Sequence, residues 1–377
     1  MNVKMVSDLF DPVKTPRIVV KVGSALLVGR DGQPRREWLA KLAAEIAAAT
    51  ERGQQVIVVS SGAIALGAAR LRLPKGGRAS LSEAQAAAAV GQIALSGLWA
   101  ELLGGHGLTA AQLLVTLEDL EGRRRYLNAS ATIGKLLRAG AVPVVNENDS
   151  VATHEIRFGD NDRLAARVAQ AAKANAVVLL SDIDGLYDRD PRDPEAKMVE
   201  RVKGVTAKIL AMASGDSASG MGSGGMTSKL HAAQIAERAG ITLAIINGTH
   251  DSPLERASKA NLGTLFLPRR RDSARKAWLG GRLRMKGALI VDSGCASALQ
   301  DGGSLLASGI LSVEGGFSRG DAVAVRDEEG RFLAKGLAEY DAAEVSAIAG
   351  TRSKQQEKLL GYAPRSAVIH RDHMVLL

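Results

Sequence analysis

Short apolar runs alternate with longer segments of helical periodicity through the first 267 residues. Five runs rich in Val, Leu and Ile lie at 17–21, 56–59, 142–145, 177–180 and 243–246. Each is apolar on both faces, as the strands of a buried parallel sheet are. Helical patterns lie between them, at 37–52, 82–103 and 226–239. The alternation predicts a three-layer α/β sandwich with a mostly parallel central sheet.

The pattern changes after residue 286. Short β-like pieces at 288–291, 322–325 and 367–370 are separated by Gly-Gly and Asp-Gly pairs, and one helical segment covers 341–349. Short strands with frequent turn signals are typical of a small, mostly-β domain. A chain of 377 residues has room for such a second domain. The tail therefore predicts a separate β domain over 287–377.

Charge is concentrated between these two regions. Residues 268–286 contain eight Lys and Arg against one Asp, which accounts for most of the net charge of +9. The tail after them is slightly acidic. A basic run of this kind is most often a solvated connector and less often an RNA or anion patch. We therefore expect a disordered arm over 1–16, a main domain over 17–267, a basic linker over 268–286 and the β domain over 287–377.

Composition excludes several classes of protein. Cys295 is the one cysteine, so no disulfide can form within the chain. The N-terminus has no apolar signal core, and no run approaches 18 uninterrupted apolar residues, so we expect a cytoplasmic protein without a membrane segment. Neither G-x-x-x-x-G-K-[ST] nor a G-x-G-x-x-G after the first strand is present, and the six histidines form no H-E-x-x-H motif. A P-loop, a dinucleotide fold and a protein-held zinc are therefore disfavoured.

Two early strand ends are followed by residues suited to anionic ligands. Lys21 ends the first strand and is followed by a glycine, which lets backbone N–H groups approach a phosphate. Ser61, Gly62 and Ala63 open a helix after the second strand. Each motif taken singly has an equally good structural explanation: a tight turn with a surface lysine for the first, and a serine that only caps the helix for the second.

Polar residues also follow the strand at 142–145. Asn146, Glu147, Asn148 and Asp149 come directly after it, and polar residues in that place rarely serve a core. Further on, Asn161 and Asp162 open a helical segment. They could cap that helix, or Asn161 could hold a substrate amine or carboxylate while Asp162 orients lysines.

A Gly/Ser run at 215–228 flows into a helix with Lys229 on its first turns. Such a run can form a flexible mouth for an anion at a helix N-terminus. A flexible linker is the plain alternative, but it explains neither the start of the helix nor the lysine. This segment is the strongest single signal in the chain.

In order along the chain, these pieces resemble the amino acid kinase family. The segments VKVGSALL, VVSSGAIALG, VVNENDSVATHEIRFGDND, LLSDIDGLYDRDP and GSGGMTSK are most similar to its glutamate 5-kinase branch. The tail, with SLLASGI, FSRGD, IAG and LGY, resembles the PUA domain that bacterial members of that branch carry. The resemblance runs from about residue 17 to the C-terminus.

The resemblance implies an ATP-dependent transfer of phosphate to the side-chain carboxylate of L-glutamate, the first step of proline biosynthesis, with Mg²⁺. It implies catalytic roles for Lys21, Lys229 and Asp162, and glutamate binding by Ser61, Gly62, Ala63, Asp149 and Asn161. It implies ATP binding by Lys21, Ser181, Asp182, Ser223, Gly224, Gly225, Met226, Thr227, Ser228 and Lys229, and it assigns no metal ligand among the side chains.

The resemblance also implies inhibition by proline, a homo-oligomer and hand-over of the product to a glutamyl-phosphate reductase. Two alternatives stay open at this point. Another carboxylate kinase of the same fold, such as an acetylglutamate kinase or an aspartokinase, would lack the C-terminal β domain. An RNA-binding protein acting through a PUA domain would leave the first 267 residues unexplained, and the acidic tail speaks against specific nucleic-acid binding.

Overall fold

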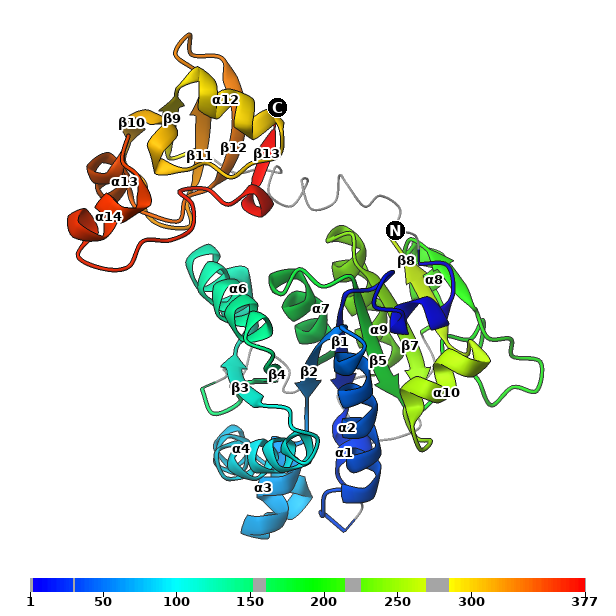
Figure 1. Cartoon of the computed structure of the whole chain (residues 1–377). Helices are drawn as coiled ribbons and strands as arrows, with labels where there is room; N and C mark the ends of the chain where they lie inside the picture. The colour runs from blue at the N-terminus through cyan, green and yellow to red at the C-terminus, as the bar shows by residue number, and fades with distance from the viewer. Residues whose placement is uncertain (1–2, 30, 152–160, 214–224, 269–284, 377) are drawn as a thin grey trace. The chain divides into compact units, whose positions relative to one another are not determined.

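The computed structural model describes residues 3–29, 31–151, 161–213, 225–268 and 285–376 (Figure 1). The chain divides into two compact units. One comprises residues 1–121 and 129–271, and the other comprises residues 122–128 and 272–377. Most of the predicted linker at 268–286 lies outside the described residues.

An eight-stranded sheet forms the centre of the first unit, in the order β3-β4-β2-β1-β5-β7-β8-β6. The strands are parallel except that β8 runs antiparallel to β7 and β6 pairs in parallel with β8. Their bounds are β1 (Arg17–Val22), β2 (Gln55–Ser60), β3 (Ala110–Val115), β4 (Val142–Glu147), β5 (Ala176–Ser181), β6 (Arg201–Lys203), β7 (Thr242–Asn247) and β8 (Thr264–Leu267). This confirms the expected mostly parallel sheet, including all five predicted strands.

Helices cover both faces of this sheet, so the layers are those of an α/β sandwich (Figure 1). Side chains of α2, α4 and α10 share one core with alternate residues of the central strands, while α7 and α9 pack together and against β1, β5 and β7. The helices are η1 (Val6–Phe10), α1 (Ser24–Leu27), α2 (Arg36–Glu51), α3 (Ala63–Leu71), η2 (Pro74–Gly77), α4 (Leu81–Gly104), α5 (Leu117–Glu121), α6 (Arg123–Arg138), α7 (Asn161–Ala171), α8 (Ala207–Ala211), α9 (Met226–Arg238) and α10 (Pro253–Ala260).

Helices α3 and α4 cross in close contact. A Cβ atom added to Gly67 would lie 1.8 Å from the carbonyl oxygen of Ala87, and one added to Gly91 would lie 1.8 Å from that of Ala63. Two glycines therefore allow the backbones to touch. Because Ala63 opens α3 directly after the second strand-end motif, this crossing fixes α4 beside that motif.

Helix α4 is long and apolar enough to span a membrane by length and composition alone. Eight of its residues are buried within the unit, among them Leu95, Leu98 and Trp99. The indole Nε1 of Trp99 donates a hydrogen bond to Ser60 Oγ at 2.9 Å. These contacts are those of a core helix, which passes the same length-and-composition test.

The N-terminal segment differs from the expected disordered arm. Residues 6–10 form the 3₁₀ turn η1, with Val3, Val6 and Leu9 buried in the main core. The Gln54 side chain anchors the segment, because its amide group donates hydrogen bonds to the main-chain carbonyls of Leu9 at 2.8 Å and Thr15 at 2.7 Å. The three-residue spacing of Val3, Val6 and Leu9 is the feature of the sequence that could have predicted this ordered segment.

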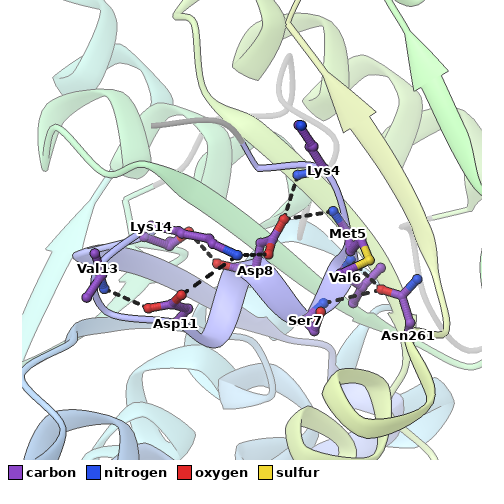
Figure 2. A network of polar contacts seen from close by, with 10 residues as sticks. Lys4, Met5, Val6, Ser7, Asp8, Asp11, Val13, Lys14 and Asn261 are labelled. Carbon is purple, nitrogen blue, oxygen red and sulfur yellow. Dashed lines mark hydrogen bonds and ion pairs between the residues drawn. The ribbon is translucent and has the colours of Figure 1, made fainter.

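A carboxylate organises the same segment (Figure 2). Asp8 Oδ2 accepts hydrogen bonds from the backbone N–H groups of Lys4 and Met5, and Asp8 Oδ1 pairs with Lys14 Nζ at 2.5 Å. Asn261, at the end of α10, accepts from the N–H of Val6 at 2.8 Å. Burial raises the pKa of Asp8, but the Lys14 charge and the N–H donors outweigh this and hold it below its usual value. The segment is therefore an integral part of the first unit.

The second unit contains a five-stranded sheet in the order β10-β9-β11-β12-β13, in which only β9 and β11 pair in parallel. Asp341 caps α13, and the Asp341 and Glu344 side chains each accept from the other's backbone N–H. Its elements are β9 (Gly287–Val291), α12 (Ser293–Gln300), η3 (Ala307–Gly309), β10 (Ile310–Gly315), β11 (Ala322–Arg326), β12 (Phe332–Leu337), α13 (Ala342–Ile348), α14 (Ser353–Leu360), η4 (Arg371–His373) and β13 (Met374–Leu376).

The small β-rich tail is thus confirmed, with two corrections. The sequence predicted one helical segment, whereas the described part of the tail has three α-helices, α12, α13 and α14. The piece at 367–370 is not a strand, since only Ile369 forms an isolated bridge, with Leu305. Its apolar residues instead fill the core between the sheet and α13, where Val368 and Ile369 are buried with Tyr340 and Val345. A run of buried apolar residues does not by itself distinguish a strand from a core-packed loop.

Candidate active site

The central strand β1 lies between β2 and β5; the strands that follow β2 in the chain, β3 and β4, extend the sheet on one side, and those that follow β5 extend it on the other. In open parallel sheets, ligands bind beyond the carboxyl ends of the strands at such a point. Lys21 lies near the end of β1, Ser60 ends β2 and is followed by Ser61, and Ser181 ends β5. The topology therefore gathers the strand-end motifs at one edge of the sheet.

Two lysines and one carboxylate form the centre of this edge. Lys21 Nζ lies 2.6 Å from Asp162 Oδ1, and Lys229 Nζ lies 3.1 Å from Asp162 Oδ2. All three side chains are buried, with exposed fractions of 6%, 7% and 1% for Lys21, Lys229 and Asp162. Three separate parts of the chain meet here: a strand end, the start of α7 and the start of α9.

The charges of this cluster are mutually dependent. Burial alone would raise the pKa of Asp162, but the ammonium groups of Lys21 and Lys229 outweigh it and hold that pKa below its ordinary value. One carboxylate faces two cations, so the cluster carries a net positive charge in a buried place. Such a charge attracts a phosphate, and it is stronger in a low-dielectric site than in water.

Helix α9 adds to this positive field. It begins at Met226 after Gly225, whose extended backbone serves as the N-cap, and Lys229 follows on the first turn. The first N–H groups of a helix have no acceptor within it, and its N-terminus carries a partial positive charge. The predicted ATP-binding residues Gly225, Met226, Thr227 and Ser228 therefore surround a suitable anion site, whereas Ser223 and Gly224 lie outside the described residues.

The predicted glutamate-binding residues lie beside the lysines. Asn161, the first residue of α7, donates from Nδ2 to Ser61 Oγ at 2.6 Å and to Asn146 Oδ1 at 3.3 Å. Asn161, Ser61 and Asn146 are all buried. Side chains thus join the residue that follows β2 directly to the first residue of α7, and Asp162 is the next residue of that helix.

Asp149 lies on the loop after β4 and lines a cavity of about 420 Å³, together with Gln92 and Ser96 of α4, Glu147 and Asn148. Burial raises the pKa of Asp149 to about 6, and the positive charge of Arg78 opposes this only in part. Within the described part of the chain, Asp149 Oδ1 and Asn161 Oδ1 are buried acceptors without a hydrogen-bond donor. Two such oxygens suit a ligand that carries N–H groups.

Gly62 has to be glycine for two reasons. Its φ of 113° lies in the left-handed region, and a Cβ atom there would lie 2.9 Å from Leu27 Cδ2. The turn it makes starts α3 immediately after Ser61 and presents the N–H groups at the helix start. Ala63 follows as the first helical residue and is buried.

The remaining predicted nucleotide positions lie at the end of β5. Ser181 is buried and donates from Oγ to Asp182 Oδ1 at 3.2 Å. Asp182 itself is exposed. Beside them, Asn247 at the end of β7 donates from Nδ2 to Asp184 Oδ1 at 2.9 Å. These polar groups form the far side of the same sheet edge.

Metal chemistry has little protein support in the described ranges, where no three His, Cys, Asp or Glu side chains gather to hold an ion. Both oxygens of Asp162 already face lysines. Mg²⁺ usually keeps several waters and is held by one or two carboxylates together with substrate phosphates.

Sequence reasoning missed three neighbours of this site. Asn146 lies within the motif after β4, so its place was visible but its role was not. Gln92 lies in the middle of α4, where no motif marks it, and its Oε1 accepts from Asn146 Nδ2 at 2.8 Å. Arg78 lies in an irregular segment just before α4 and acts on Asp149 through its charge.

Comparison with known proteins gives consistent family assignments. The amino acid kinase family model matches residues 16–247, and the PUA domain model matches residues 287–360. The chain is 67% identical to a glutamate 5-kinase of Novosphingobium aromaticivorans over 377 residues, covering 100% of both chains. The protein of the same name from Sphingopyxis alaskensis is 61% identical, over 98% of this chain and 100% of its own length. The one from Zymomonas mobilis is 56% identical, over 98% of this chain and 93% of its own length. With the family model matching more than half of its length, this chain belongs to the amino acid kinase family.

Proposed function

We propose that this chain is a glutamate 5-kinase, which transfers the γ-phosphoryl group of ATP to the side-chain carboxylate of L-glutamate and so begins proline synthesis. The similarity to proteins of that name over the full chain supports the activity. The observation that carries the mechanism is the buried pair of lysines on either side of Asp162. The relatives do not favour the RNA-binding alternative.

Phosphoryl transfer depends mainly on positioning and on neutralising charge at the transferred group. Lys21 and Lys229 supply two ammonium groups from different elements, and Asp162 holds both in place. The glutamate carboxylate has an ordinary pKa of about 4.3, so it is ionised at neutral pH and needs no general base. Its oxygen bonds to the γ-phosphorus while the bond from that phosphorus to the β–γ bridging oxygen breaks, and ADP leaves with the electron pair.

Magnesium is the usual companion of ATP in such reactions. We propose that phosphate oxygens hold it here, and no step above depends on a side chain that binds the metal. On the glutamate side, we propose that Asp149 and Asn161 bind the α-ammonium group and that Ser61 and the N–H groups of Gly62 and Ala63 bind carboxylate oxygens. The unpaired acceptors Asp149 Oδ1 and Asn161 Oδ1 support the first assignment.

The proposed activity is tested by incubating the protein with ATP, Mg²⁺, hydroxylamine and one acceptor at a time. Glutamate should give a coloured hydroxamate, because hydroxylamine traps an acyl phosphate. Acetylglutamate and aspartate should give little. Hydroxamate formed mainly from either of these would assign the chain to a different kinase of the same fold.

Asp149 predicts a pH dependence of glutamate binding. With a pKa of about 6 in the free protein, Asp149 is ionised above that pH and becomes protonated as the pH falls through it. A neutral carboxyl group attracts an ammonium group less, so kcat/KM for glutamate should fall about tenfold per pH unit below 6. The same profile measured on Asp149→Asn, at the same fixed concentration of ATP, should be flat in this pH range. A wild-type profile parallel to that of the variant would remove Asp149 from glutamate binding.

We further propose that proline competes with glutamate, since it shares the α-amino and α-carboxyl groups. Proline at millimolar concentration should raise the glutamate KM without changing kcat, and the Asp149→Ala variant should lose affinity for both compounds. Unchanged rates at sub-saturating glutamate would show that this protein is not regulated in this way.

The assembly and the division of labour between domains are also proposals. We propose a homo-oligomer, which light scattering at micromolar concentration would test, and hand-over of the unstable acyl phosphate to a glutamyl-phosphate reductase. The hand-over is tested in a coupled assay with the reductase present. If the reductase does not suppress the spontaneous cyclisation of glutamyl 5-phosphate, the hand-over is excluded. We propose that the domain predicted over 17–267 also includes the N-terminal segment from residue 3, which packs into its core, and that the second domain covers 287–377; the two family models match within these limits. Limited proteolysis tests these limits: cleavage inside either domain at an earlier time than cleavage in the linker would contradict them.

A further inference from the structure

A chain of side-chain hydrogen bonds leads from helix α4 into the proposed glutamate site. Gln92 Nε2 donates to Ser96 Oγ at 3.3 Å, and Ser96 Oγ donates its own proton to the main-chain carbonyl of Gln92 at 2.7 Å. Since the serine proton is committed to that carbonyl, Ser96 can only accept from the Gln92 side chain. The orientation of the Gln92 amide is therefore fixed within α4, with Oε1 directed away from Ser96.

The next links carry this orientation inward. Asn146 Nδ2 donates to Gln92 Oε1 at 2.8 Å, which turns Asn146 Oδ1 toward Asn161 Nδ2 at 3.3 Å. Asn161 Nδ2 also donates to Ser61 Oγ at 2.6 Å. Every donor of the Asn161 amide is then used, and Asn161 Oδ1 is left buried with no donor among the described residues.

Without Gln92, the opposite orientation of the Asn146 and Asn161 amides would be satisfied equally well by hydrogen bonds among Asn146, Asn161 and Ser61, and it would disable the site. If Asn146 reversed its amide, its Nδ2 would donate to Asn161 Oδ1, and Ser61 could donate its proton to the same oxygen. Asn161 would then present N–H groups to the ligand, and the Ser61 proton would no longer be available for a substrate carboxylate. Side-chain amides have nearly the same shape in both orientations, so their hydrogen-bond partners decide which one prevails.

We propose that Gln92 is a positioning residue, which fixes through Asn146 the amide orientation of Asn161 that accepts a hydrogen bond from the substrate's α-ammonium group. This rests on the proposed function, because the ligand is taken to be glutamate. Gln92 acts through two other residues, and its effect is largest on the part of the substrate that carries N–H groups. The close α3–α4 crossing at Gly91 holds the adjacent Gln92 at a fixed distance from the strand ends.

The test compares glutamate with glutarate, which has both carboxylates but no amino group. In Gln92→Met, which keeps the size of the side chain and removes both polar atoms, kcat/KM for glutamate should fall about tenfold, the loss of one hydrogen bond to a charged group. The value for glutarate should fall less than that for glutamate, since glutarate can lose the Ser61 contact but does not use the Asn161 acceptor, and the KM for ATP should change less than about twofold. Gln92→Glu retains an acceptor for Asn146 and should restore most of the preference for glutamate.

An equal loss with glutamate and glutarate would mean that Gln92 serves packing only, and an unchanged preference for glutamate in Gln92→Met would also overturn the proposal. If Gln92→Met unfolds, Ser96→Ala decides, because it frees the Gln92 amide and should reduce the same preference; an unchanged preference there overturns the proposal. Wild-type protein that forms no hydroxamate from glutamate would overturn the proposed function itself, which separates the two failures.

Discussion

Replacing Lys229 with alanine should lower kcat roughly 10²–10³-fold, the usual loss when one donor to a transition state is removed. Lys229 is the cation on the first turn of α9, where it is buried beside Asp162. Its charge matters most when negative charge is passing between ATP and the acceptor, so kcat should fall more than the ATP KM rises. Lys21→Ala should show a loss of similar size from the β1 side.

The fold should survive Lys229→Ala, because Lys21 remains at 2.6 Å from Asp162 and no charge is left unpaired. Lys208→Ala provides a matched control, since Lys208 is an exposed lysine on the short helix α8. Steady-state hydroxamate formation with circular dichroism of each variant gives the comparison. A kcat of Lys229→Ala close to that of the control, in folded protein, would exclude Lys229 from the transfer step.

Replacing Asp162 with alanine should have the largest effect on stability. It would leave two buried ammonium groups next to each other without a carboxylate, and breaking a buried ion pair from one side costs about 3–5 kcal/mol. Urea denaturation of wild type and variant measures this loss. Because the folded pKa of Asp162 is held low, its stabilising effect is present above the ordinary value of about 3.9 and is lost as the pH falls through the folded pKa.

ATP should partly rescue Asp162→Ala, because its phosphates can replace the missing negative charge. The ATP-induced rise in the unfolding temperature should therefore be larger in the variant than in the wild type, while kcat stays low since the lysines are no longer held apart. A stability loss below about 1 kcal/mol, the usual size for an exposed pair, would show that the cluster is less dependent on Asp162 than its geometry indicates.

The central strands could be predicted from sequence because they are buried on both faces. Val19, Val58 and Val178 are almost wholly inaccessible, and this produces the continuous apolar runs that mark β1, β2 and β5. The edge strands β3 and β6, and the short strand β8 beside β6, were not predicted. In β3 only Val115 is buried, and β6 is three residues long with one buried residue, so neither carries the pattern of a buried strand.

The lysine and carboxylate of the site were also accessible to sequence reasoning, since Lys21, Asp162 and Lys229 each stand at a strand end or helix start. The structure brings these three side chains together, and their catalytic roles stay predictions. Gln92 could not have been found in this way. Its importance arises from the packing of α4 against the end of β4, which places residues 54 positions apart within hydrogen-bond distance.

The central claim, that the acceptor is the carboxylate of glutamate, has a direct isotopic test. The protein is supplied with ATP, Mg²⁺, hydroxylamine and glutamate whose side-chain carboxylate carries ¹⁸O. If that carboxylate attacks the γ-phosphorus, its oxygen becomes the bridge of the acyl phosphate, and it leaves with phosphate when hydroxylamine attacks the carbonyl carbon. Mass spectrometry should then find one ¹⁸O atom in each phosphate released. Phosphate without the label would mean that water or another acceptor takes the phosphoryl group, and would contradict the account.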